Sequence, residues 1–133
     1  LETATTIKNN DLKNVVKIYN VNHYQKYIEM EHVDTVHNEL GKWNDVYNGL
    51  CELNSIGVCY YDIKPDNVGY SKIDKCWKLF DFDYVCIFND DNKWIINPVN
   101  DAKSIGYGKY FNEPNIKEIS LRIFNDYMNN KIL

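Results

Sequence analysis

The regular spacing of apolar residues in one segment constrains the fold more than any other feature of the sequence. Its apolar side chains are Trp43, Val46, Tyr47, Leu50 and Leu53. They recur every three or four residues, which is the period of an α-helix with one buried face. Gly57 follows as a typical helix terminator, so the sequence predicts a helix from Trp43 to Ile56.

Strand patterns precede this helix. The segments VVKIYNV (15–21) and YQKYIEMEHV (24–33) are joined at Asn22 and His23, and they predict an antiparallel pair of strands. The segment DTVHNELG (34–41) then predicts a short helix, because it begins with a possible N-cap and ends with a glycine.

Short strands and one more helix follow the central helix. VCYY (58–61) predicts an extended segment, and NVGYS and CWKLFDF flank KIDK (72–75) as a small hairpin. YVCIF and KWIIN flank NDDN (89–92) and predict a second hairpin. The last helix is opened by Asn112 and Pro114. Its apolar stripe is Ile116, Ile119, Ile123, Phe124 and Tyr127. This order of elements predicts the α+β class.

Composition excludes several functional classes. The chain has 133 residues, 44% of them hydrophobic and 26% charged, which predicts one folded domain. A net charge of −4 argues against general binding to nucleic acids or anionic membranes, since both require a basic surface. No apolar run reaches the roughly 18 residues of a membrane span, and the N-terminus lacks a signal pattern. We therefore expect a cytoplasmic protein that is neither secreted nor transmembrane.

The cysteines and histidines show no metal-binding spacing. Cys51, Cys59, Cys76 and Cys86 lie among apolar neighbours without a CxxC pair, so buried free thiols are favoured over disulfides. The three histidines match no zinc pattern, and solvated or core positions are favoured for them.

Two short segments carry the side chains that could bind a metal ion or take part in catalysis. DIKPDN (62–67) supplies two types of oxygen ligand and a lysine, and DFD (81–83) supplies further carboxylates. Carboxylate and amide oxygens suit Mg²⁺, which completes its octahedron with water and substrate phosphates. A nearby lysine can neutralise a transferring phosphoryl group, and a carboxylate can orient an attacking hydroxyl. The alternative is ordinary turn chemistry, since Asp, Pro and Asn all favour turns.

Together these segments resemble the protein-kinase family. The catalytic loop of that family reads H-R-D-x-K-P-x-N, and this chain has Y-Y-D-I-K-P-D-N; the D-F-G motif is similar to Asp81-Phe82-Asp83. The lysine in the loop resembles the serine/threonine-specific form. The resemblance implies that Asp62 orients the acceptor, that Lys64 contacts the phosphates, and that Asn67 and Asp81 bind ATP through Mg²⁺.

Flanking segments extend the resemblance over nearly the whole chain. YIEMEHVD is similar to the fifth strand and hinge, which implies that Met30, Glu31 and Val33 lie at the adenine edge. IGYGKYFNEP resembles the end of the activation segment. The implied architecture is a reduced protein-kinase-like domain over residues 1–133. Residues 1–33 would be a remnant of the small lobe with the hinge, and residues 34–133 a minimal, mainly helical large lobe.

Several family features are missing, which implies strong truncation at both ends. A Gly-rich loop and the small-lobe lysine do not occur, so Glu2 is expected to be a solvated surface acid. Tyr60 and Tyr61 replace His and Arg, so control through a phosphorylated activation segment is not expected. Glu113 and Pro114 occur in swapped order, and the usual salt bridge of this glutamate is expected to find no partner.

Three functions compete on these observations. The first is a weak or partner-dependent protein kinase that passes the γ-phosphoryl group of ATP to a Ser or Thr hydroxyl. The second is a catalytically impaired, pseudokinase-like module that binds or regulates a kinase chain, which would supply the missing lobe, or another protein. The third is a small-molecule phosphotransferase, since D-F-D also occurs in enzymes resembling aminoglycoside kinases.

Overall fold

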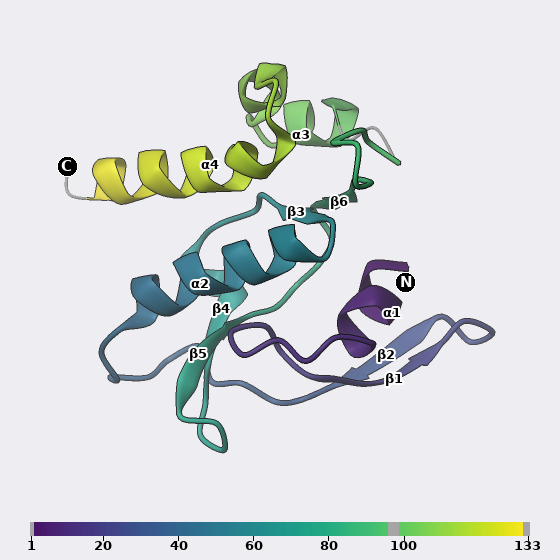
Figure 1. Ribbon diagram of the computed structural model, residues 1–133. Helices are drawn as coiled ribbons and strands as arrows, with labels where there is room; N and C mark the ends of the chain where they lie inside the picture. Colours follow the sequence, from purple (N-terminus) through teal and green to yellow (C-terminus); the bar gives the residue numbers. More distant parts are fainter. Residues whose placement is uncertain (1, 96–98, 132–133) are drawn as a thin grey trace.

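The fold alternates small antiparallel sheets with helices, which confirms the α+β class (Figure 1). A computed structural model describes residues 2–95 and 99–131. The elements are α1 (Glu2–Lys8), β1 (Ile18–Asn22), β2 (Tyr27–Met30), α2 (Lys42–Ser55), β3 (Val58–Tyr60), the 3₁₀ turn η1 (Pro65–Asn67), β4 (Val68–Ser71), β5 (Cys76–Leu79), β6 (Val85–Ile87), α3 (Val99–Ser104), the 3₁₀ turn η2 (Gly108–Asn112) and α4 (Ile116–Lys131).

Two of the predicted hairpins are confirmed, and the third is confirmed over its described residues. β1 pairs with β2, and β4 pairs with β5, both antiparallel. The predicted second hairpin has an antiparallel bridge between Phe88 and Trp94, and the amides of Asn89 and Ile95 donate to the carbonyls of Lys93 and Ile87, both at 2.9 Å. The last residues of this hairpin, 96 and 97, lie outside the described residues. β6 also pairs with the distant β3, which the sequence did not predict; Cys59 and Cys86 are register partners in that pair.

The prediction of a helix over residues 34–41 is wrong. Asp34 is extended and exchanges two backbone hydrogen bonds with Tyr70, at 3.0 and 2.8 Å. Its carboxylate accepts a hydrogen bond from the amide of Val36, which is a local turn that competes with a helix. Val36 and Leu40 are 86% and 92% exposed, so no apolar face stabilises a helix here.

The predicted central helix is confirmed as α2, which lies between the other elements (Figure 1). Val46, Leu50 and Leu53 are buried on one face. Gly49 lies so close to the preceding loop that an added Cβ would be 2.7 Å from the carbonyl oxygen of Asn14. A glycine at this position therefore lets the helix approach the loop that leads into β1.

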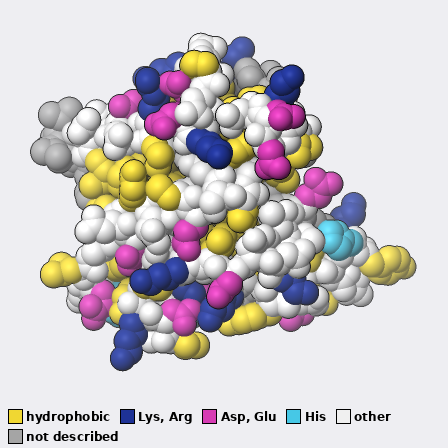
Figure 2. All heavy atoms as spheres, viewed as in Figure 1, with side chains coloured by type: hydrophobic (Ala, Val, Ile, Leu, Met, Phe, Trp, Pro, Cys, Tyr) yellow, Lys and Arg dark blue, Asp and Glu magenta, His cyan; other side chains and the backbone are white. Residues whose placement is uncertain are grey.

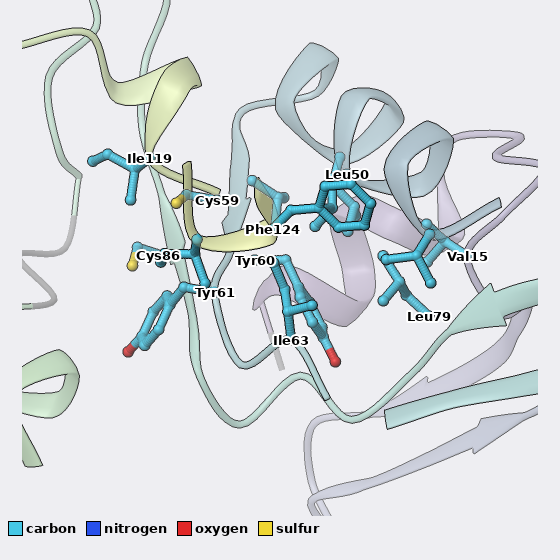
Figure 3. Packing of buried hydrophobic residues seen from close by; sticks show 14 of the residues in the cluster. Val15, Leu50, Cys59, Tyr60, Tyr61, Ile63, Leu79, Cys86, Ile119 and Phe124 are labelled. Carbon is cyan, nitrogen blue, oxygen red and sulfur yellow. The ribbon is translucent and has the colours of Figure 1, made fainter. Parts of the chain in front are cut away.

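Side chains from both halves of the chain form the core (Figure 3). The predicted apolar stripe of α4 is confirmed, since Ile116, Ile119, Ile123 and Phe124 are buried and Tyr127 packs against them. All four cysteines are free and three are buried, which confirms the expected thiols. Among the described helices, none is long and apolar enough to cross a membrane.

Candidate active site

The first loop of the site is folded around Asn67. β3 delivers the chain to Asp62, and Pro65 opens the single 3₁₀ turn that ends at Asn67. Asn67 is 3% exposed, and its side-chain amide donates to the backbone carbonyl of Asp62 at 2.8 Å and to its carboxylate at 3.1 Å. Asn67 therefore fixes the position of Asp62 across the turn.

Lys64 lies beside the same carboxylate. Its ammonium is 3.7 Å from Asp62 Oδ2, and its side chain is 49% exposed. An ion pair with this exposure adds little to stability, because water screens both charges. The half-exposed Lys64 thus places a positive charge next to Asp62, and its side chain is not buried in the core.

The second loop carries Asp81 and is tied directly to the first. The amide of Phe80 donates to the carbonyl of Asn67 at 3.0 Å. The buried hydroxyl of Tyr60 donates to the carbonyl of Phe80 at 2.5 Å. Asp81 itself has a left-handed backbone with φ +62°, a conformation that is frequent at functional sites in non-glycine residues. Two hydrogen bonds from separate residues thus bring the predicted segments together.

Tyr60 is a site residue that sequence reasoning missed. The sequence pattern indicates only that it replaces a family histidine, whereas in the structure its hydroxyl joins the two loops. Figure 3 shows that the rings of Tyr60 and Tyr61 diverge, with their hydroxyls pointing in different directions. A buried polar aromatic beside the loop motif was the available signal, since such a hydroxyl usually finds a hydrogen-bond partner.

Negative charge is concentrated between the loops. The charge of Asp81 raises the pKa of Asp83, and partial burial and Asp62 raise it further. Burial raises the pKa of Tyr60 well above its usual value, and the charges of Asp62 and Asp81 add to this. The charges of Asp62 and Asp81 therefore act on the Asp83 carboxyl and on the Tyr60 hydroxyl.

The donor set fits Mg²⁺ bound together with a nucleotide. Asn67 and Asp81 offer the hard oxygen ligands that Mg²⁺ prefers. Over residues 2–95 and 99–131, no group of three or more Asp, Glu, His or Cys side chains could hold a metal ion.

The three residues expected at the adenine edge differ in their exposure and in their contacts. Met30 ends β2 and is 37% exposed. Val33 contacts β4, where a Cβ on Gly69 would lie 2.4 Å from Val33 Cγ2. The amide of Glu31 donates to the carbonyl of Lys17 at 2.9 Å, and its side chain is buried. Val33 thus lies next to β4, the strand that follows Asn67. The amide of Glu31 is already used in a hydrogen bond within the chain.

A buried ionic cluster holds Glu31. Lys78, only 1% exposed, donates to Glu31 Oε1 at 2.6 Å and to Asp74 Oδ2 at 2.5 Å. Glu31 also accepts from the amide of Lys17 at 2.8 Å and from Ser71 Oγ at 3.3 Å. This cluster joins β1 and β2 to the β4–β5 hairpin, and β5 leads directly into Asp81.

Two further expectations have clear outcomes. Glu2 is exposed in the first turn of α1, as expected of a surface acid. The expectation that Glu113 has no partner is wrong, because its carboxylate lies 2.8 Å from Arg122 Nε in α4. Arg122 lies in the second turn of α4, and the swapped motif order did not predict this ion pair.

Comparison with models of known protein families gave no match, and comparison with curated proteins gave none either. The function is therefore argued from the geometry of the two loops.

Proposed function

We propose that this chain is a reduced protein-kinase-like phosphotransferase that passes the γ-phosphoryl group of ATP to a Ser or Thr hydroxyl. The observation that carries the proposal is the junction at Asn67. Its side chain holds Asp62, and its carbonyl accepts the amide that precedes Asp81. One residue thus links the general-base candidate to the loop of the metal-ligand candidate.

Each residue has a distinct role in the proposed reaction. Asp62 orients the acceptor hydroxyl and takes its proton, and Lys64 neutralises charge on the transferring group. Asn67 and Asp81 would hold the Mg²⁺ that accompanies ATP, and this ion would supply electrostatic stabilisation of the phosphates. The backbone near Val33 contacts the adenine edge, and Met30 and Glu31 flank it.

Incubation with Mg-ATP and generic Ser/Thr acceptors tests this function. We expect phosphate incorporation that falls by about 10²-fold or more in Asp62→Asn, since general-base catalysis contributes roughly that much. Asp91→Asn is the matched control, because Asp91 is an exposed carboxylate in the turn between Phe88 and Trp94, outside both loops. Equal incorporation by wild type and Asp62→Asn contradicts the proposal, and transfer to aminoglycosides alone favours the small-molecule alternative.

A binding module is the second candidate, and the exposed surface of the β1–β2 hairpin favours it. Tyr24 and Tyr19 are 94% and 56% exposed, and Tyr27 and Met30 are each more than a third exposed. In Figure 2, hydrophobic side chains project at the free end of this hairpin. Exposed apolar surface of this kind marks protein-interaction sites, here for a kinase chain or another protein.

Nucleotide binding separates the two candidates. A ligand that binds only the folded state raises the melting temperature, by mass action. The phosphotransferase predicts a higher melting temperature in saturating Mg-ATP than in buffer or in ATP with EDTA. A flat response to nucleotide favours the binding module.

A further inference from the structure

Cys59 and Cys86 lie directly opposite each other in the β3–β6 pair, where they are register partners. Two residues further along this antiparallel ladder, the amide of Phe88 donates to the carbonyl of Gly57 at 2.9 Å. Hydrogen-bonded pairs recur every second residue, so the two cysteines also form a hydrogen-bonded pair, with Cα atoms about 5.5 Å apart. Disulfides join residues whose Cα atoms are about 4.4–6.8 Å apart, so the backbone already meets this requirement.

The two thiols lie on the same face of the strand pair. Side chains alternate between the faces along a strand, so directly opposite residues share one face. Figure 3 shows both sulfur atoms directed to the same side of the two strands. Burial raises the pKa of the Cys86 thiol, and a hydrogen bond with the Cys59 thiol raises it further. Each sulfur atom is therefore a direct neighbour of the other.

The remaining two cysteines are placed differently. Cys51 lies in α2 and is only partly buried. Cys76 begins β5 opposite Ser71, and its thiol donates to the carbonyl of Lys13 at 3.6 Å. Among the register partners of the described strands, only Cys59 and Cys86 are two cysteines.

We propose that Cys59 and Cys86 form a reversible disulfide when the protein meets a peroxide. One sulfur attacks an oxygen of hydrogen peroxide, the O–O bond breaks, and one water leaves while that cysteine becomes a sulfenic acid. The second sulfur then attacks the first, the S–O bond breaks, and the hydroxyl group leaves as water with the proton of the second thiol. The two sulfurs lose two electrons, which reduce one peroxide to two water molecules.

Burial and strand spacing determine how this site behaves. Cys59 is 0% and Cys86 2% exposed, and buried protonated thiols react slowly, so the first step is slow. Directly opposite Cβ atoms are about 4.5–5.5 Å apart, whereas a relaxed disulfide brings them to about 3.5–4.5 Å. The disulfide is therefore strained and easily reduced by thiols, which suits a redox-sensing rather than a structural bond.

The position of the bond connects it with the candidate site. A disulfide between these residues closes a loop over residues 59–86, which contains both 62–67 and 81–83. Oxidation thus places a covalent constraint on the segment that carries both site loops. The inference does not depend on the proposed function, because neither step of the oxidation involves a nucleotide.

Peptide mapping of the intact folded chain after graded exposure to hydrogen peroxide tests the inference, with alkylation of the remaining thiols. We expect a peptide pair linked between Cys59 and Cys86, lighter by two hydrogen atoms and separated again by dithiothreitol. Cys59→Ser and Cys86→Ser should each abolish the linked pair. Cys76→Ser should keep it, and this is the matched control because Cys76 is also a buried strand thiol.

Three results would overturn the inference. The first is that Cys59 and Cys86 both stay open to alkylation in the denatured sample at a peroxide dose that oxidises the partly buried Cys51. The second is a link that joins either of them to another cysteine or to a second chain. The third is a link that forms only when the chain is unfolded in urea during oxidation. Because the wild-type chain decides each result, the test holds even if a serine variant fails to fold.

Discussion

At the scale of single residues, Asn67 is the residue on which the candidate site depends. Its loop motif was readable because Asp62, Lys64 and Asn67 lie within six residues of one another in the sequence. The part that sequence reasoning missed, Tyr60, reaches the second loop through a hydrogen bond to Phe80, twenty residues further along the chain. Local adjacency is visible in a sequence, whereas such long-range contacts depend on the whole fold.

Replacement of Asn67 by Ala tests this residue directly. The change leaves the backbone carbonyl and carboxylate of Asp62 without their amide donor, so we expect a loss of about 1–3 kcal/mol in the free energy of unfolding. Chemical denaturation measures it. The control Asn44→Ala, at an exposed position of α2, should stay within about 0.5 kcal/mol of wild type. Equal stability of the two variants would show that Asn67 does not hold the loop.

At the scale of elements, the two long helices α2 and α4 were predicted, whereas the pairing of strands was predicted only in part. The apolar periodicity of α2 and α4 marks the buried face of each helix, so both helices can be predicted without knowing which elements they pack against. The β3–β6 pair joins strands separated by the β4–β5 hairpin, and local pattern cannot choose between such partners. The segment 34–41 pairs through Asp34 with β4, and this non-local contact overrides its helical signals.

The buried lysine of β5 provides a prediction at this scale. Lys78→Met leaves the Glu31 carboxylate buried without its cation, so we expect a destabilisation of about 3–5 kcal/mol. Lys78→Met combined with Glu31→Gln should recover much of this loss in a double-mutant cycle. The exposed Lys72→Met serves as control. Additive losses in the cycle would show that the two side chains are not coupled.

Asp74 makes the same cluster sensitive to acid. Its hydrogen bonds to Lys78 and then Lys17 lower its pKa below the usual value. Since the folded-state pKa is lower than the unfolded one, this contribution to stability is complete above about pH 4 and is lost as the pH falls through the folded value. We expect Asp74→Asn to flatten the decline of stability below about pH 4, measured by denaturation at several pH values. An unchanged pH profile would contradict the role of this carboxylate.

At the scale of the whole molecule, the site lies between the elements near the N-terminus and those near the C-terminus. α1, β1 and β2 lie at one end and α4 at the other, with α2 between them (Figure 1). The face seen in Figure 2 intersperses acidic and basic side chains. This face has no concentration of positive charge that would attract polyanions in general, so under the proposed function ATP is recognised through the local arrangement of the two loops.

Paramagnetic broadening by Mn²⁺, used in place of Mg²⁺ with ATP, tests most directly whether the two loops form one site. The account predicts that backbone amide signals of residues 62–67 and 81–83 broaden together at low Mn²⁺, while those near Tyr24 at the free end of the β1–β2 hairpin stay sharp. EDTA should reverse the effect. Broadening centred on another part of a folded chain, or on only one of the two loops, would contradict it.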